Sequence, residues 1–272
     1  MRIPRIRLVS GWGMRFETSD TVSKARKVLS GLFFLMACTA DAQVRAPEKS
    51  VTVHVVVSQA RATNVSKTAT SNAQDASNVV AWFTPLDRSE PAAPVSGSPQ
   101  NPPQLVQRNK TFEPHVLIVP VGTVVEFPNK DPFFHNIFSL YDGRRFDLGL
   151  YEAGTKRSVR FDRPGVSFLF CNIHAEMSAV VVSVDTPYFG LSDRDGNVVI
   201  GNVPSGRYQL TVWNERGSPE QLKELTRVVT ISDSSRTIGP IQIVQNPSFT
   251  AAHKNKYGLD YVPPPNPDYD RP

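Results

Sequence analysis

The sequence is poor in cysteine, in unbalanced charge and in long apolar runs. Its 272 residues include two cysteines, Cys38 and Cys171, and no apolar run of transmembrane length lies in the body of the chain. Residues 1–42 hold seven Lys/Arg and three Asp/Glu, which accounts for +4 of the net charge of +5. No basic cluster with interleaved aromatic residues remains after residue 42. These absences exclude a transmembrane span and argue against a nucleic-acid partner.

Residues 1–42 have the three regions of an export signal. A basic stretch at 24–27 precedes an apolar stretch of ten residues at 28–37, and the small residues of Ala40-Asp41-Ala42 suit signal peptidase. The mature chain is therefore expected to begin at Gln43 in a periplasmic or otherwise extracytoplasmic compartment. A short buried helix is the alternative.

Two details of this leader stay open. Residues 35–38 resemble a lipobox, which would leave a lipid anchor on Cys38. The signal is also complete without its first thirteen residues, so Met14 competes with Met1 as the start.

Cys171 becomes the only thiol of the exported chain once Cys38 leaves with the leader. An odd cysteine outside the cytoplasm needs a reason, and metal binding as a thiolate supplies one. Cys171, His174 and Met177 follow one another at three-residue spacing between strand-like runs, so one tight loop carries all three donors. His135, just after another strand-like run, is the candidate second imidazole. Singly, each of these residues is more often structural than ligating.

The stretches around these donors resemble the cupredoxins. The matching residues are Phe112-Glu113-Pro114, the run Val-Gly-Thr-Val-Val-Glu-Phe at 121–127, the His135-Asn136 pair and the short loop at 171–177, which is similar to that of amicyanin. The resemblance implies one type 1 copper ion. Its ligands would be the thiolate of Cys171, the imidazoles of His135 and His174, and a weak axial Met177. The resemblance also implies that the backbone N–H of Asn136 donates to the cysteine sulfur.

Over residues 50–216 the chain looks like periplasmic proteins labelled methylamine utilisation proteins. The shared stretches are Cys-Asn-Ile-His at 171–174, Asp-Thr-Pro-Tyr-Phe at 185–189 and Val-Pro-Ser-Gly-Arg-Tyr at 203–208. That family often has His after the tryptophan that follows, whereas Asn214 stands here. Any role of that histidine is lost in this chain.

Short β-branched runs separated by turn residues predict an all-β protein of two sandwiches. We expect a cupredoxin-like Greek-key β-sandwich over residues 43–187, with mobile loops at 60–78 and 88–110. A second small sandwich at 188–246 resembles the carboxypeptidase regulatory-like module. The proline-rich tail at 247–272 is expected to lie extended on the surface or to be disordered.

The predicted function is to carry single electrons between redox partners, such as a small redox protein or a dehydrogenase. We expect no catalysis, because His54, His115 and His253 are isolated, whereas copper oxidases need further histidines, commonly in His-x-His pairs. Copper storage or delivery, carbohydrate or partner binding, and a metal-free structural sandwich remain as alternatives.

Overall fold

The computed structural model describes residues 49–59, 75–87, 101–140, 142–249 and 253–261. These residues form sixteen strands and one helix, which confirms the expected all-β class. No helix among them is long and apolar enough to cross a bilayer. The predicted export signal, the lipid-anchor candidate Cys38 and most of both predicted loops lie outside the described residues.

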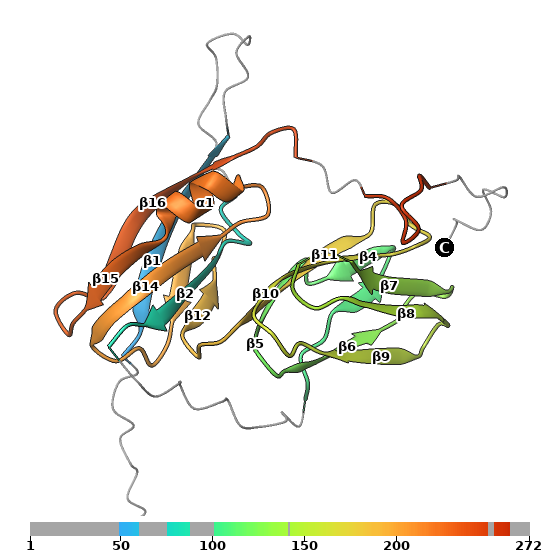
Figure 1. The fold of residues 1–272 in the computed structure, drawn as a ribbon, viewed down its shortest axis with the longest axis horizontal. Helices are drawn as coiled ribbons and strands as arrows, with labels where there is room; N and C mark the ends of the chain where they lie inside the picture. Colours follow the sequence, from blue (N-terminus) through green and yellow to red (C-terminus); the bar gives the residue numbers. More distant parts are fainter. Residues whose placement is uncertain (1–48, 60–74, 88–100, 141, 250–252, 262–272) are drawn as a thin grey trace, which may run out of the picture. The chain divides into compact units, whose positions relative to one another are not determined.

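Nine consecutive strands form one β-sandwich, called here the central sandwich (Figure 1). They are β3 (Val106–Arg108), β4 (Thr111–Glu113), β5 (Val116–Pro120), β6 (Val124–Pro128), β7 (His135–Ser139), β8 (Phe146–Tyr151), β9 (Lys156–Arg160), β10 (Gly165–Phe170) and β11 (Ser178–Val184). Five of them form a sheet in the order β5-β11-β10-β7-β8. The pair β5 and β11 is parallel, and the other neighbours are antiparallel.

The opposite layer of the central sandwich is made of two antiparallel pairs, β3 with β4 and β6 with β9. Isolated parallel bridges join Gln104 to Glu126 and Gln107 to Asn129, so the β3–β4 hairpin lies beside β6. A single apolar core fills the central sandwich, and its members include Leu105, Phe127, Ile137, Phe161, Leu169, Cys171 and Met177. The arrangement is consistent with a cupredoxin-like β-sandwich.

The remaining strands form a second unit, called here the outer sandwich. Its elements are β1 (Val51–Gln59), β2 (Val80–Pro85), β12 (Phe189–Leu191), β13 (Asn197–Ile200), β14 (Gly206–Trp213), α1 (Pro219–Leu225), β15 (Arg227–Ile231) and β16 (Thr237–Gln245). They build two sheets, β13-β1-β16 and β12-β2-β14-β15. Ser218 caps the N-terminus of helix α1, and its hydroxyl accepts the N–H of Gln221.

The place of β1 and β2 differs from the domain order that the sequence predicts. We expected residues 43–187 to form one domain, but β1 pairs with β13 and β16, and β2 pairs with β12 and β14. The alternate valines of β1 are buried in the core of the outer sandwich. A β-branched run identifies a strand but not its partner, because period-two alternation is the same in either sheet. The outer sandwich is therefore built from two segments of the chain, one that precedes the central sandwich in the sequence and one that follows it.

A smaller correction concerns the loop predicted at 88–110. Within it, the structure describes residues 101–110, and these include strand β3. The hairpin turns at Asn109 and Lys110, which both have positive φ, 52° and 57°. Two such residues in a row match the type I′ turn that two-residue hairpins prefer. The proline-rich composition of the segment obscured this short hairpin.

A third apolar cluster joins strands of both sandwiches. Buried valines from β2, β5 and β11 meet there, and Trp82, Phe168 and Trp213 pack against them. The rings of Phe168 and Trp213 contact each other edge to face, with centroids 6.3 Å apart. The two sandwiches therefore share buried apolar surface.

Candidate metal centre

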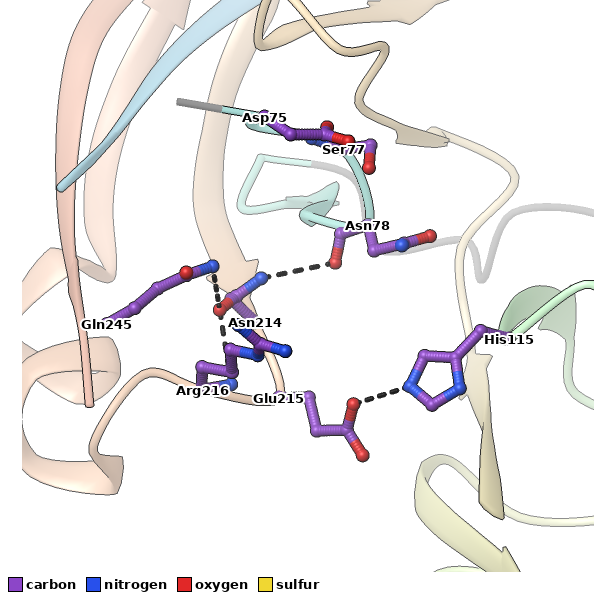
Figure 2. A pocket seen from close by; sticks show the side chains of 8 residues that line it. All are labelled: Asp75, Ser77, Asn78, His115, Asn214, Glu215, Arg216 and Gln245. Atoms are coloured by element: carbon purple, nitrogen blue, oxygen red, sulfur yellow. Dashed lines mark hydrogen bonds and ion pairs between the residues drawn. The ribbon is translucent and has the colours of Figure 1, made fainter. Parts of the chain in front are cut away.

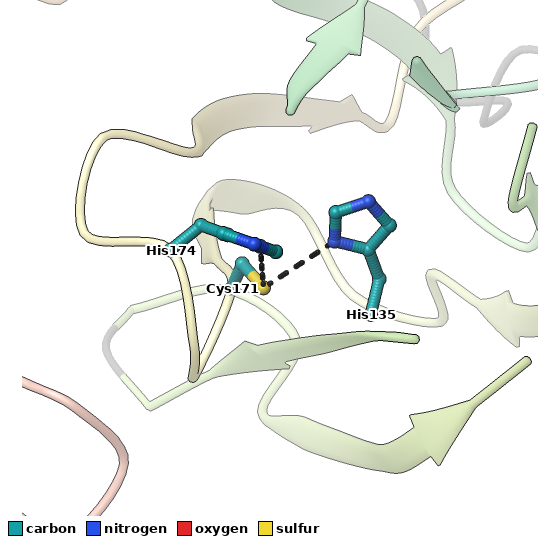
Figure 3. A group of neighbouring side chains, drawn as sticks. All are labelled: His135, Cys171 and His174. Atoms are coloured by element: carbon teal, nitrogen blue, oxygen red, sulfur yellow. Dashed lines mark hydrogen bonds between the residues drawn. The ribbon is translucent and has the colours of Figure 1, made fainter. Parts of the chain in front are cut away.

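Three of the predicted ligands meet at one end of the central sandwich. Cys171 is the first residue after β10, His174 lies in the loop that follows, and His135 opens the neighbouring strand β7 (Figure 3). The Nδ1 atom of His174 lies 3.5 Å from the Cys171 sulfur, and Nδ1 of His135 lies 3.8 Å from it. All three residues are buried. The 36-residue separation between His135 and Cys171 is closed by the antiparallel pairing of β7 with β10.

The loop between β10 and β11 is closed by its own backbone. Phe170 pairs with Ser178 across the two strands, and the Cys171 N–H donates to the Met177 carbonyl at 3.2 Å. The Met177 N–H donates in turn to the His174 carbonyl at 3.2 Å. The predicted placement of Cys171, His174 and Met177 on one tight loop between two strands is confirmed. Met177 is fully buried in the core beneath that loop.

The spacing of the donor atoms fits a single bound ion. Metal–nitrogen bonds of about 2.0–2.1 Å and metal–sulfur bonds of about 2.3 Å, at angles between about 109° and 120°, place nitrogen and sulfur about 3.5–3.8 Å apart. The two observed separations, 3.5 and 3.8 Å, fall in that range. One thiolate with two imidazoles is also a set that suits copper or zinc rather than calcium or magnesium. The three residues could therefore hold a soft or borderline metal ion.

Burial acts on the protonation of these donors in opposite directions. Burial raises the pKa of the Cys171 thiol, although backbone N–H groups of Asn136, Ile173 and His174 favour the thiolate. The resemblance to cupredoxins likewise implies a donor at Asn136. Burial lowers the pKa of His135, which keeps its imidazole neutral and free to ligate. A positive ion would favour the thiolate further, so metal binding should release the thiol proton.

Phe133 covers the two imidazoles, a role that the sequence did not indicate. Its ring centroid lies 5.1 Å from that of His135 and 5.6 Å from that of His174. The two imidazole centroids are themselves 4.8 Å apart. An aromatic ring over both ligands restricts their rotation and limits the approach of water. Phe133 stands two residues before a candidate ligand, and only its position in space reveals this packing.

Asp131 is a second site residue that sequence reasoning missed. Its Oδ2 atom lies 2.7 Å from Nε2 of His135, the ring nitrogen that does not face the sulfur. Burial alone would raise the pKa of Asp131, but hydrogen bonds from Lys110, His135 and Asn109 lower it below its ordinary value. The group is therefore a carboxylate at neutral pH. A buried carboxylate four residues before a histidine is visible in the sequence only after the ligand is known.

Residues 253–261 of the predicted tail pack against the ligand loop. Tyr261 donates its hydroxyl to the Cys171 carbonyl, at 2.5 Å, and the N–H of Lys256 donates to the side chain of Asn172, at 2.9 Å. The imidazole of His253 stacks on Phe170, with ring centroids 4.0 Å apart. Burial raises the pKa of Tyr261, so its hydroxyl stays protonated and able to donate. Residues 253–261 thus brace the loop that carries Cys171; the rest of the predicted tail beyond 249 lies outside the described residues.

Replacing Tyr261 with Phe should loosen this brace. The change removes one hydrogen bond to a partly buried carbonyl, so we expect a loss of about 0.5–1.5 kcal/mol in the free energy of unfolding. Urea unfolding of the mature chain measures it. Tyr257→Phe is the matched control, because Tyr257 lies in the same segment and is 71% exposed. Loss of its hydroxyl should cost at most about 0.5 kcal/mol. Equal stability of the two variants would show that the tail does not brace the loop in solution.

The other histidines have partners of their own. Nδ1 of His54 lies 3.2 Å from the side-chain oxygen of Asn197. His115 is partly buried, and its Nε2 atom lies 2.6 Å from Glu215, which raises the pKa of His115 (Figure 2). The pair lines a polar cavity of about 220 Å³ together with Asp75, Ser77, Asn78, Asn214, Arg216 and Gln245. None of these contacts places a further histidine at the site of Cys171.

Comparison with known proteins gives structural likeness alone. No protein-family profile and no curated protein matches the chain. Among solved structures, the purple cupredoxin of Nitrosopumilus maritimus is similar at 26% identity over 30% of this chain and 99% of its own, with a TM-score of 0.28. A reduced amicyanin variant is 19% identical over 38% of this chain and 98% of its own, with a TM-score of 0.30.

A third similar structure is the Cu-containing nitrite reductase of Thermus scotoductus SA-01. It is 26% identical over 37% of this chain but only 27% of its own length, with a TM-score of 0.30. These similar structures are thus cupredoxins or, in one case, a copper enzyme matched over a part of its chain. The three likenesses span between 30% and 38% of the present chain.

Proposed function

We propose that the protein is an exported mononuclear blue copper protein that carries single electrons between redox partners. The observation that carries the proposal is the buried group of His135, Cys171 and His174, with sulfur–nitrogen separations of 3.5 and 3.8 Å. Met177, at the end of the same loop, would be the weak axial ligand, and the backbone N–H of Asn136 would donate to the sulfur. A thiolate with two imidazoles and a long axial thioether is the donor set of electron-transfer copper sites.

The protein around these side chains suits a one-electron carrier. Copper would supply the redox change, and the chain would hold the donors in one arrangement in both oxidation states. Closure of the loop by Cys171 and Met177, the ring of Phe133 and the brace from Tyr261 all restrict movement of the donors. Restricted movement lowers the reorganisation that accompanies each electron transfer.

A redox partner would contact the protein at exposed residues next to the ligands. Phe134, beside His135, has 49% of its surface exposed, and Ile173, beside His174, has 37% exposed. Exposed apolar side chains at such positions are suited to brief contact with a small redox protein or a dehydrogenase. An enzymatic role in the manner of a multicopper oxidase is disfavoured, because His54, His115 and His253 have other contacts.

Extracytoplasmic location remains part of the proposal and rests on the sequence of residues 1–42. A single buried thiol that binds metal is compatible with an oxidising compartment, since coordination shields the sulfur.

The optical spectrum of the oxidised protein tests the proposal. On addition of one equivalent of Cu(II) to the purified mature chain, we expect an intense visible band from thiolate-to-copper charge transfer, together with the narrow copper hyperfine splitting of a blue site in electron paramagnetic resonance. Reduction by ascorbate should bleach the band, and a small redox protein should restore it rapidly. Tight copper binding without colour would instead favour copper storage in a site of another geometry.

A further inference from the structure

The strongest unassigned feature at the site is the carboxylate behind His135. The two nitrogens of that imidazole face different groups: Nδ1 lies 3.8 Å from the Cys171 sulfur, and Nε2 lies 2.7 Å from Oδ2 of Asp131. Figure 3 shows the second ring nitrogen of His135 pointing away from Cys171. His135 is 0% exposed and Asp131 is 5% exposed. The pair therefore lies where water screens its interaction poorly.

The Asp131 carboxylate is itself fixed by backbone donors. The N–H of Asn109 donates to Oδ1 at 2.6 Å, and the N–H of Lys110 donates to Oδ2 at 3.0 Å. Both donors are the turn residues of the β3–β4 hairpin, and their positive φ values, 52° and 57°, turn the two N–H groups toward the same side. Asp131 also donates its own N–H to the side chain of Asn129, at 3.0 Å. The acceptor is thus held in place independently of any metal.

From this geometry we infer that Asp131 is a positioning residue for the copper ligand His135. The inference rests on the proposed function and deepens it. An acceptor at Nε2 keeps the ring proton on that nitrogen, which leaves the lone pair of Nδ1 directed at the site of Cys171. Hydrogen bonding to a carboxylate also makes the imidazole a stronger electron donor, and this favours the more positive, oxidised ion. Asp131 therefore orients the ligand and lowers the reduction potential of the site.

The first test needs no metal and reads the ring tautomer. Nitrogen-15 NMR of histidine in the metal-free mature chain should show the proton of His135 on Nε2, with Nδ1 bare. In Asp131→Ala the preference for that tautomer should be lost. A proton on Nδ1 in the unaltered chain, or an unchanged tautomer in Asp131→Ala, would overturn the inference. Since no copper is present, this result is independent of whether the protein carries electrons.

The second test reads the potential of the copper-loaded chain. In Asp131→Asn, which removes the charge and keeps the size, we expect the affinity for Cu(II) to fall by about tenfold relative to that for Cu(I). A tenfold change equals a rise of about 59 mV in a one-electron potential. Asp162→Asn is the matched control, because its carboxylate pairs with Arg144 near the surface of the same sandwich. A potential that changes no more in Asp131→Asn than in this control would overturn the electrostatic part of the inference.

Discussion

Replacing Cys171 with Ser should abolish the visible band of the copper-loaded protein. The band requires electron transfer from a thiolate to Cu(II), and a serine hydroxyl is a harder and far weaker electron donor. Copper affinity should fall as well, because the remaining donors are two neutral imidazoles and a thioether. Titration of the purified variant with Cu(II), followed by absorption and by competition with a chelator, measures both effects.

The fold of the serine variant should survive, which separates loss of metal from loss of structure. Cys171 is fully buried, but the backbone N–H groups of Asn136, Ile173 and His174 point toward its sulfur and give a hydroxyl oxygen acceptable partners. Circular dichroism and urea unfolding of the metal-free proteins should therefore be similar. If the serine variant does not fold, the visible band is tested instead with the substitutions of the two histidine ligands.

The relative effects of the ligand substitutions on copper binding test the proposed site more specifically than Cys171→Ser alone. His135→Ala and His174→Ala should weaken binding or admit water, because each removes one corner of the donor triangle. Met177→Leu is nearly equal in volume, so it should cost at most about 1.5 kcal/mol of stability while copper and colour persist. Its reduction potential should rise, since the weak axial donor is gone. Loss of copper in Met177→Leu as complete as in Cys171→Ser would contradict the proposed site.

Three of the candidate ligands could be found in the sequence because their spacing is local. Cys171, His174 and Met177 lie within one loop, and the strands on both sides show their β-branched runs directly. His135 required an assumption about strand pairing, and β7 does pair with β10. Short β-branched runs separated by turn residues likewise predicted the all-β class.

The parts that sequence failed to predict depend on contacts between distant segments. Asp131 and Tyr261 act on the site through hydrogen bonds whose partners have no common motif. Both are ordinary polar residues in segments that read as loop or tail. The pairing of β1 with β16 joins residues nearly two hundred positions apart. Such pairings are selected by the complementary shape of two apolar faces, which the pattern of a single strand does not contain.

The discontinuous outer sandwich gives the second large prediction, which concerns fragments. All strands of the central sandwich lie within residues 106–184, and every member of its core falls within 105–181. A fragment of residues 101–187 should therefore fold and bind one copper ion. Its stability should be lower than that of the mature chain, because it lacks the brace from Tyr261 and exposes the apolar face of β11.

A longer fragment, residues 43–187, should aggregate more readily, although it contains more of the chain. It keeps β1 and β2 but removes β12 to β16, the strands that pair with them. Val51, Val53, Val55 and Val57 are at most 6% exposed in the whole structure and would become uncovered. Each such valine loses about 1.5–3 kcal/mol of burial, and the unpaired strand edges favour association between chains.

Size-exclusion chromatography with light scattering, combined with the copper titration, compares the two fragments with the mature chain. We expect a monomer with the visible band for residues 101–187 and soluble aggregates or precipitate for residues 43–187. The opposite result, a folded monomer for 43–187 and an unfolded 101–187, would mean that β1 and β2 support the copper-binding sandwich. The shorter fragment should fold because a domain is defined by the residues that share its core. Among the residues that the structure describes, the core around Cys171 includes none before Leu105.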